Sequence, residues 1–255
     1  MDETGLPSGY RREAHDSVTS TSSVVLERAR NGDPGGLWVT ARDQTEGRGR
    51  RGRHWTTGEG NLAASLLLVD PAPPPIAATI SFVAGLALHR AIVGLAGIAL
   101  VERLKLKWPN DLLLGGRKVA GILVEGEKMA DGRFAVAVGI GVNCLSHPQS
   151  EATFAADDLM TGGVAIESER LFAGLAFTMA DEIERWDRGG GFAEVRSAWL
   201  DRAYGIGERI TVNLNDRVID GSFETLDDDG RLVLGRPGGA RETISAGDLF
   251  FAGRA

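Results

Sequence analysis

Cysteine is almost absent from this 255-residue sequence, in which Cys144 is the single example. One thiol cannot form an intramolecular disulfide framework or a multi-cysteine metal site, so both are excluded. Such low cysteine usage fits a reducing compartment, and we expect a cytoplasmic protein. Cys144 follows a predicted strand, where a lone cysteine is usually a small buried residue, and we assign it no chemistry.

Positive charge and uninterrupted apolar sequence are also scarce. The 28 Lys and Arg residues against 35 Asp and Glu residues give a net charge of -7, so the whole chain repels nucleic acid at long range. The most apolar stretch, residues 76–101, is interrupted by His89 and Arg90, which favours a buried helix over a membrane span. No apolar segment typical of a secretory signal follows the acidic N-terminus. We therefore expect neither DNA nor a membrane as a partner.

Glycine, in contrast, is abundant. The chain has 35 glycines, about twice the average usage, which indicates many tight turns or close backbone approaches. Hydrophobic residues at 43% and charged residues at 25% are near the average for soluble globular proteins, which argues against disordered, collagenous and coiled-coil classes. The length predicts one catalytic-sized domain with a small appendage.

Apolar spacing predicts an α/β arrangement before Tyr204. Strands, expected to form one sheet, are predicted over residues 37–40, 61–69, 103–108, 118–125 and 134–142. A Ser/Thr-rich N-cap region followed by a short helix is predicted within residues 18–30, and further helices are predicted over residues 76–102, 168–186 and around 192–199. After Tyr204 the pattern changes to short alternating strands separated by Asp- and Gly-rich turns, which predicts a small all-β barrel or sandwich. We therefore divide the chain into a larger N-terminal domain, residues 1–204, and a C-terminal domain, residues 205–255.

The most informative segment is the arginine loop, residues 47–55, which reads GRGRRGRHW. Its glycines match the dinucleotide-binding pattern GxGxxG, but the apolar strand before it and the helix after it that this pattern requires are missing. Glycine lets amides point at oxygens while guanidinium groups pair with phosphate or carboxylate, so we expect an anionic ligand. Charge density alone also fits a solvated surface loop or an arginine-rich RNA-binding tract. We further expect such a tract of like charges to lack one fixed shape until an anion binds.

Three further segments combine strand ends with polar residues. They are residues 107–111 (KWPND), 118–125 (KVAGILVE) and 139–143 (GIGVN). Taken singly, each also fits a hairpin with charged ends or a strand that ends in a turn. Their order after the arginine loop is a more specific signal than any one of them.

In this order, the four segments resemble the biotin protein ligases, whose signatures GRGRxGRxW, KWPND, K(V/L)AGILVE and GxGxN are intact here. The resemblance runs from about residue 17 to the C-terminus. It implies an α/β (α+β) fold: a class II synthetase-like catalytic domain with a central mixed sheet flanked by helices, and a small C-terminal SH3-like β-barrel. It also implies an ATP-dependent, AMP-forming enzyme. Such an enzyme makes biotinyl-5′-AMP from biotin and ATP, then transfers biotin to one lysine of a biotin carboxyl carrier domain of acetyl-CoA carboxylase or a related carboxylase.

The resemblance implies three overlapping sets of site residues. The biotin-binding set is Ser20, Thr21, Ser22, Gln44, Arg48, Gly49, Arg50 and Lys118. The ATP- and adenylate-binding set is Arg50, Arg51, Arg53, Trp55, Lys118 and Asn143. The catalytic set is Lys118, Arg48, Arg50 and Asp111. Ser22 stands where the family has Asn, which removes an amide from the biotin pocket.

These residue types suit the implied chemistry. The ureido group of biotin is neutral and polar, so its pocket needs a few hydroxyl or amide partners within apolar walls. Adenylation brings a carboxylate against the α-phosphate, and Arg48, Arg50 and Lys118 would offset that repulsion. Mg²⁺ is expected to bind mainly through ATP, because the sequence contains no legible set of metal ligands. Asp111 either positions the acceptor lysine or only caps the turn into Leu112, and both interpretations stay open.

Two other functions compete with this interpretation. A lipoate or octanoate ligase or transferase shares the catalytic fold, but the complete arginine loop and the C-terminal barrel favour biotin. A nucleic-acid-binding regulator is the second alternative, because some members of the family carry an N-terminal helix-turn-helix. About fifteen residues precede the first matched segment here, too few for that motif, so we expect no repressor function. A homodimer formed through a sheet edge is also compatible with the sequence.

Overall fold

The computed structural model of the chain describes residues 5–148, 155–214 and 216–251. Its main sheet is built from β1 (Arg11–Val18), β2 (Leu37–Gln44), β3 (Leu62–Val69), β4 (Leu104–Lys107), β5 (Asp111–Leu114), β6 (Arg117–Lys128) and β7 (Phe134–Val142). A second sheet contains β8 (Arg209–Asn213), β9 (Val218–Leu226), β10 (Leu232–Gly235), β11 (Arg241–Ile244) and β12 (Asp248–Phe251). The helices are α1 (Thr21–Arg30), α2 (Pro74–Ala77), α3 (Ile80–Ala96), α4 (Ser168–Trp186) and α5 (Phe192–Leu200). Short 3-10 turns are η1 (Arg50–Gly52), η2 (Ile98–Leu100) and η3 (Asp187–Gly189).

The seven strands of the main sheet follow the order β1-β2-β3-β7-β6-β5-β4. β1 and β2 are parallel, and every other neighbouring pair is antiparallel. The predicted central mixed sheet is therefore confirmed. In β7, Val136 and Val138 belong to the core on one face, while Ala135 and Ala137 belong to the core on the other. Burial on both faces explains why the sequence of this strand is apolar almost throughout.

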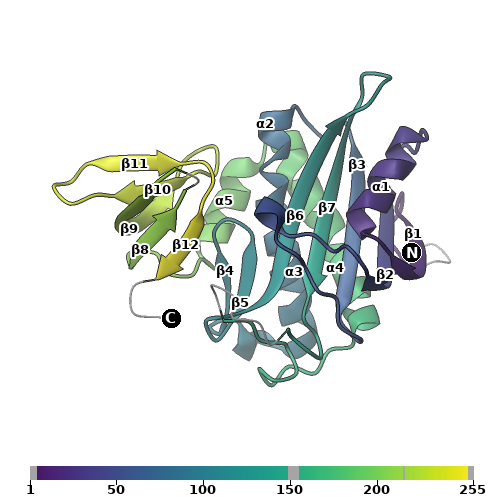
Figure 1. Ribbon diagram of the computed structural model, residues 1–255, viewed down its shortest axis with the longest axis horizontal. Helices are drawn as coiled ribbons and strands as arrows, with labels where there is room; N and C mark the ends of the chain where they lie inside the picture. The colour runs from purple at the N-terminus through teal and green to yellow at the C-terminus, as the bar shows by residue number, and fades with distance from the viewer. Residues whose placement is uncertain (1–4, 149–154, 215, 252–255) are drawn as a thin grey trace.

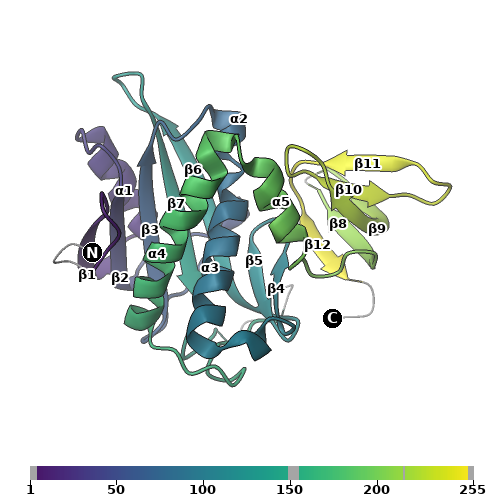
Figure 2. The ribbon, with the colours of Figure 1, turned by 180° about the vertical axis from the view of Figure 1, so that it is seen from behind.

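Helices cover the two faces of the main sheet unequally. α3, α4 and α5 lie together on one face, and α1 lies on the other (Figures 1 and 2). Val25, Leu26 and Ala29 of α1 belong to a small core with residues of β2, β3 and β7. The arginine loop crosses the same face in front of β6 and β7 (Figure 1). This face, which α1 covers only in part, is where the candidate site lies.

The helix predicted over residues 76–102 is divided and shorter in the structure. α2 ends at Ala77, α3 begins at Ile80, and α3 ends at Ala96 before Gly97, whose φ of 101° suits glycine and stops the helix. By length and composition Pro74–Ala96 could cross a membrane, but 72% of its apolar window is buried inside the protein. It is placed as a core helix, as the interruption by His89 and Arg90 predicted.

Two strands of the main sheet, β1 and β5, were not predicted from the sequence. β1 reads RREAHDSV and is an edge strand, so its polar side chains stay near the surface, as in the Arg12–Glu169 and Arg28–Glu13 ion pairs. Charged edge strands carry no clean apolar alternation, because they have no buried face to fill. β5 follows β4 directly as the second half of a hairpin, with Lys107 paired to Asp111.

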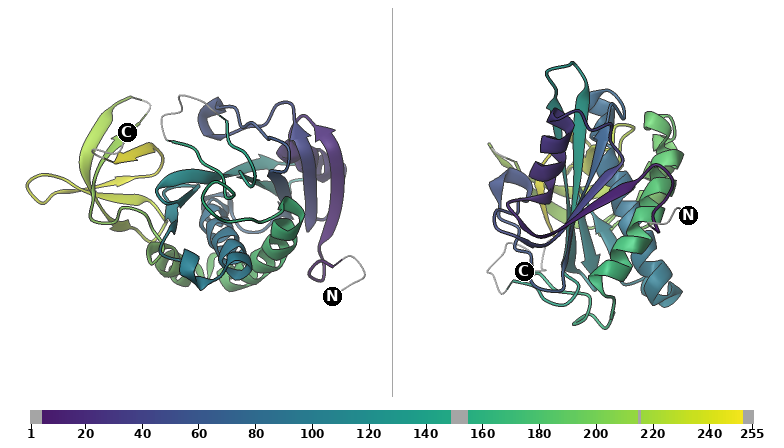
Figure 3. Two further views of the ribbon diagram at one scale, coloured as in Figure 1. Left: turned by 90° about the horizontal axis from the view of Figure 1, so that it is seen from below. Right: turned by 90° about the vertical axis from the view of Figure 1, so that its right-hand side faces the viewer.

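The C-terminal sheet is antiparallel, in the order β11-β10-β9-β8-β12, and confirms the predicted all-β domain. It lies at the end of the molecule opposite β1 (Figure 1 and Figure 3, left). The predicted boundary at residues 204 and 205 falls in the connection between α5 and β8. Trp108 Nε1 donates a 3.2 Å hydrogen bond to Gly230 O, and Arg196 Nη1 donates one of 2.7 Å to Leu226 O. These buried and half-buried contacts fix the small domain against the catalytic domain.

Candidate active site

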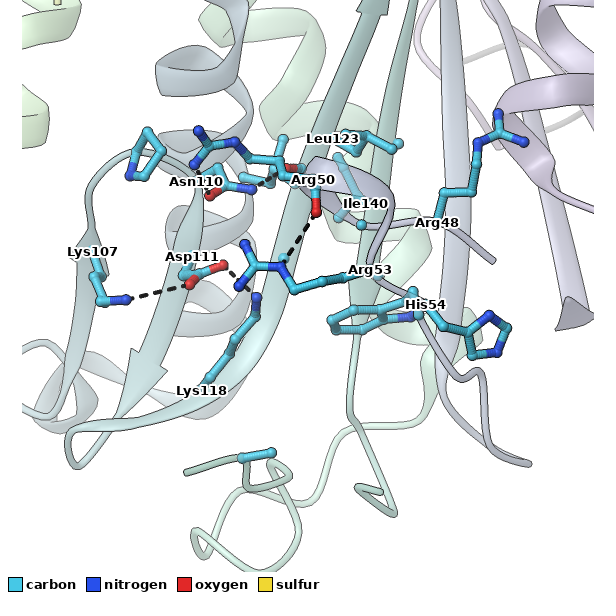
Figure 4. Close-up of a pocket in the computed structure, with 18 of the residues that line it drawn as sticks. Arg48, Arg50, Arg53, His54, Lys107, Asn110, Asp111, Lys118, Leu123 and Ile140 are labelled. Carbon is cyan, nitrogen blue, oxygen red and sulfur yellow. Dashed lines mark hydrogen bonds and ion pairs between the residues drawn. The ribbon is translucent and has the colours of Figure 1, made fainter. Parts of the chain in front are cut away.

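A single pocket of about 430 Å³ contains most of the predicted site residues. Its walls come from the start of α1, the arginine loop, the β4–β5 hairpin, β6, β7 and β12. Figure 4 shows the cationic end of this pocket, where Lys107, Asp111 and Lys118 lie together below Asn110 and Arg50. The four segments that resemble the family motifs therefore meet at one place, together with the start of α1 and with β12 of the C-terminal sheet.

The neutral end of the pocket is a cluster of buried hydroxyl groups at the start of α1. Thr21 donates both its backbone N and its Oγ1 to Gln44 Oε1, at 2.9 and 3.1 Å. Ser65 Oγ lies 2.7 Å from Thr21 Oγ1 and 3.0 Å from Ser22 Oγ. Gln44 Nε2 in turn donates to Thr57 Oγ1. The network holds uncharged donors and acceptors in place, which suits a neutral polar ligand group.

Three glycines in β6 and β7 make the floor of the pocket. A Cβ on Gly141 would clash with the Trp55 indole, and a Cβ on Gly139 would come within 2.7 Å of Ser22 Oγ. Gly121 also lies against Trp55 and Lys118. Glycine is needed here because the Trp55 ring and the Ser22 hydroxyl rest directly on the sheet. The GxG pattern of residues 139–143 is thereby explained as close approach.

The cationic end is built around one buried carboxylate. Asp111 Oδ1 lies 2.5 Å from Lys118 Nζ, and Asp111 Oδ2 lies 3.7 Å from Lys107 Nζ. Although burial acts to raise the pKa of Asp111, the positive charges of Lys118 and Lys107 hold it below its usual value. No capping hydrogen bond to this carboxylate is found within the described residues. The structure therefore places Asp111 in the charged centre of the pocket, where the capping interpretation finds no support.

The arginine loop closes on itself before it reaches the pocket. Gly49 N donates to Arg53 O at 2.7 Å, and Trp55 N donates to Gly47 O at 2.8 Å. Arg50 Nη1 lies 3.3 Å from Asn110 Oδ1, while Asn110 Nδ2 donates to Ile122 O on β6. Asn110 thus ties the loop to the sheet. Burial lowers the pKa of the Arg50 guanidinium. A guanidinium that is removed from water in this way attracts an anion more strongly than an exposed one does.

Two predicted arginines point away from this centre. Arg48 lines the pocket, but its guanidinium turns towards α1 and β6, where it contacts Ser23 Oγ at 2.9 Å and Glu125 at 3.2 Å (Figure 4). Arg51 is not among the lining residues and pairs with Asp248 at 3.0 Å. The structure thus brings Arg50, Arg53 and Lys118 together and leaves Arg48 and Arg51 at the rim.

The C-terminal sheet supplies a carboxylate to this site. Asp248, the first residue of β12, pairs with Arg51 at 3.0 Å and with Arg53 at 2.8 Å. Arg50 Nη1 lies 3.4 Å from Gly247 O. The loop was expected to take one shape only with an anion, and here Asp248 provides a negative charge from the other domain. Asp248 could not be predicted from the sequence, because nothing in a short polar turn indicates which distant loop it will face.

Two further residues were missed for similar reasons. Lys107 is 6% exposed, and Ser65 is fully buried. Lys107 belongs to the KWPND segment, which places this residue near the site but does not indicate its role. Ser65 has no signal beyond a polar residue inside an apolar strand. A buried hydroxyl of that kind needs a partner, and this was the clue available.

The other polar groups near the pocket are accounted for. Asn143 Nδ2 donates to Asp157 O, while its buried Oδ1 accepts no hydrogen bond from the described residues and is left for a ligand. Burial raises the pKa of Cys144 to about 12, so this thiol is not a nucleophile.

His147, Asp157 and Asp158 cluster nearby. Asp158 already accepts hydrogen bonds from Thr161, which makes the cluster a loop-closing network.

Charge in the pocket is opposite to the charge of the chain. Its lining includes five cationic side chains, from Arg48, Arg50, Arg53, Lys107 and Lys118. The two lining carboxylates, Asp111 and Asp248, are both paired with these or neighbouring cations. A pocket with a neutral hydrogen-bonding end and a positive end can hold one ligand that is polar at one end and anionic at the other, next to a phosphate group.

Known proteins are similar to this chain in sequence and in fold. Residues 15–143 match the Biotin/lipoate A/B protein ligase family, and residues 205–251 match the Biotin protein ligase C terminal domain. The chain is 42% identical over 241 residues to biotin--[acetyl-CoA-carboxylase] ligase of Paracoccus denitrificans, across 92% of this chain and 98% of that protein. It is 32% identical over 250 residues to the protein of the same name from Mycobacterium tuberculosis, across 96% of this chain and 91% of the relative.

Among solved structures, the biotin protein ligase of Aquifex aeolicus in complex with biotin and ATP matches with a TM-score of 0.77. Its sequence identity is 24%, over 95% of this chain and 99% of that chain, so this likeness concerns the fold. The fold and the site together define a ligase that joins a small carboxylic acid to protein. The chain belongs to the biotin/lipoate A/B protein ligase family.

Proposed function

We propose that the chain is an ATP-dependent biotin protein ligase that makes biotinyl-5′-AMP and transfers biotin to one lysine of a biotin carboxyl carrier domain. The observation that carries this proposal is the two-ended pocket, with buried hydroxyls at one end and Lys118, Arg50 and Arg53 at the other. The similarity to biotin--[acetyl-CoA-carboxylase] ligases over almost the whole chain supports the choice of acid and of carrier.

In the first step the ureido group of biotin faces the hydroxyl cluster, and the carboxylate of biotin points towards Lys118. The biotin carboxylate oxygen attacks the α-phosphorus of ATP, and pyrophosphate leaves with the electron pair of the broken P–O bond. Both reactants are anions, so the cations at this end offset their repulsion and hold them in line. Asn143, with its uncommitted Oδ1 at the pocket wall, suits a donor on the adenine ring.

In the second step the amine of the acceptor lysine attacks the carbonyl carbon of biotinyl-5′-AMP, and AMP leaves. The amine must lose a proton as the amide forms. Asp111 is the ionised carboxylate at the cationic end of the pocket, and we assign it the orientation of that lysine and the acceptance of its proton.

Magnesium is proposed only as part of the substrate MgATP. The lining carboxylates, Asp111 and Asp248, are occupied by ion pairs, so the described pocket offers no carboxylate cage for a resident ion. The substrate's own phosphate oxygens are the natural ligands.

Biotin is favoured over lipoate by the hydroxyl cluster. The dithiolane ring of lipoate offers no strong hydrogen-bonding group, so Thr21, Ser22 and Ser65 would be buried against an apolar ring. We further propose a cytoplasmic enzyme that binds neither DNA nor membranes, on the grounds of its cysteine usage and its net charge. A homodimer formed through the edge strand β1 remains part of the proposal, since that edge has one unpaired side.

The test is mass spectrometry of a purified carrier domain after incubation with the enzyme and MgATP. With biotin, we expect one biotinyl group on one lysine; with lipoate or octanoate, we expect no modification. Omitting ATP should abolish the reaction, and preformed biotinyl-5′-AMP should restore it. Modification by lipoate in preference to biotin would overturn the choice of substrate.

A further inference from the structure

Two lysines share one carboxylate at the centre of the pocket, and they differ in their surroundings. The Lys118 side chain is 27% exposed and reaches into the open pocket, whereas the Lys107 side chain is 8% exposed at the end of β4. Asp111 lies between them, on the strand between β4 and β6, and is paired directly with Lys107 in the β4–β5 hairpin (Figure 4). Neither the sequence patterns nor the family motifs assign a role to Lys107.

Binding of substrate must change this arrangement. If the ammonium of Lys118 turns to the biotin carboxylate and the α-phosphate, its 2.5 Å contact with Asp111 is weakened or lost. Asp111 would then be a buried anion that had lost its nearest cation, which is unfavourable without a second partner. Lys107 lies buried on the neighbouring strand and already faces Asp111 Oδ2, at 3.7 Å.

We propose that Lys107 is a positioning residue that keeps the Asp111 carboxylate ionised and oriented after Lys118 has turned to the reactants. This rests on the proposed function, in which Lys118 binds the anions and Asp111 accepts the proton of the acceptor lysine. In this arrangement Lys118 binds the reactants, and Lys107 keeps Asp111 ionised as the base.

Other charged groups also lie near Lys107 and Asp111. Arg53 and Arg50 of the arginine loop and Asp248 of β12 act on Asp111 or Lys107 from the opposite wall. Asp248 is itself paired with Arg51 and Arg53, so it does not replace Asp111 as the partner of Lys107. Burial lowers the pKa of Lys107, and the negative charges of Asp111 and, less strongly, Asp248 oppose this effect.

The experiment measures the transfer step alone, in Lys107→Met and Lys107→Arg variants of the full chain. Each enzyme is given preformed biotinyl-5′-AMP and a carrier domain, and single-turnover rates are recorded across about pH 3.5 to 9, a range that includes the acid limb of a carboxylate whose pKa lies below its usual value. Lys105→Met is the matched control, because Lys105 lies on the same strand and pairs with Glu102 instead.

For Lys107→Met we expect the acid limb of the pH–rate profile to move to higher pH by about one unit or more, because Asp111 loses the cation that keeps it ionised. Lys107→Arg should return the limb to the wild-type position, and Lys105→Met should leave it unchanged. If Lys107→Met does not fold, as judged by circular dichroism, Lys107→Gln replaces it.

An unchanged acid limb in a folded, uncharged variant overturns the proposal. Equal losses in Lys107→Met and Lys107→Arg with no shift also overturn it, because they indicate packing alone. Failure of the proposed function looks different, since wild-type enzyme would then transfer no biotin at any pH.

Discussion

At the scale of single residues, Lys118 is the group on which the proposed first step depends most. Lys118→Ala removes the cation that faces both reactants, so we expect adenylate formation to fall by on the order of a hundredfold, with a smaller effect on the affinity for ATP. Lys118→Arg should rescue poorly, because a planar guanidinium does not replace a compact ammonium. Biotin-dependent ATP–pyrophosphate exchange measures the rate, and circular dichroism checks folding. Near-normal exchange in folded Lys118→Ala would remove this residue from the mechanism.

Gly141 tests whether the bare floor of the pocket is required. Gly141→Ala places a methyl group where the Trp55 indole lies, and overpacking of this kind lowers the unfolding free energy by about 1–3 kcal/mol. Displacement of Trp55 should also disturb Lys118, which lies 5.7 Å from its ring. Gly94→Ala is the control, since that helical position has open space and should become more stable, by about 0.5–1 kcal/mol. Urea unfolding measures the stability of both variants. A Gly141→Ala variant as stable as wild type would contradict the close approach of Trp55 to Gly141.

At the scale of elements, the attachment of α3 to β4 depends on a neutral histidine. His89 Nε2 donates to Leu104 O at 3.2 Å, and burial lowers the pKa of His89 from 6.5 to about 4. The folded-state pKa is below the unfolded one, so the unfolded chain takes up the proton first. Stability is therefore full above about pH 6.5 and is lost as the pH falls towards about 4.

By about pH 5 we expect this group to have reduced the unfolding free energy by about 2 kcal/mol. His89→Gln keeps a donor for Leu104 O but does not titrate, so its stability should depend less on pH by that amount. Urea unfolding near pH 7 and near pH 5 gives the comparison. Parallel pH dependence of wild type and variant would show that His89 is not the group responsible.

Elements were predictable where burial leaves a pattern. α4 runs from Ser168 to Trp186, the same bounds that helical spacing predicts, because one face packs on the core and the other is solvated. β1 was missed because an exposed edge strand has no buried face. The helix predicted over residues 76–102 was too long, because an apolar run shows burial without showing where the chain turns.

At the scale of the whole molecule, Asp248 joins the two domains through the arginine loop. Asp248→Asn removes the charge that holds Arg51 and Arg53, so we expect trypsin to cleave this loop faster in the variant than in wild type. Biotin with MgATP should protect both proteins, because the adenylate supplies another anion. Asp220→Asn is the matched control, since Asp220 in the same sheet contacts Thr211 and not the loop. Equal cleavage of Asp248→Asn and wild type without ligand would exclude Asp248 as the tether.

The fold class, the all-β C-terminal domain and the four segments that carry the chemistry could all be predicted from the sequence alone. Apolar periodicity predicts which residues are buried. Glycine and charged residues in a fixed order predict a local backbone conformation and the kind of ligand that it binds. Which side chains contact one another became clear from the three-dimensional arrangement. Long-range pairing brings Ser65 to the hydroxyls of α1, Asp248 to the arginine loop, and Lys107 and Lys118 to one carboxylate. Such contacts depend on strand order and domain packing, which leave no periodic signal along the chain.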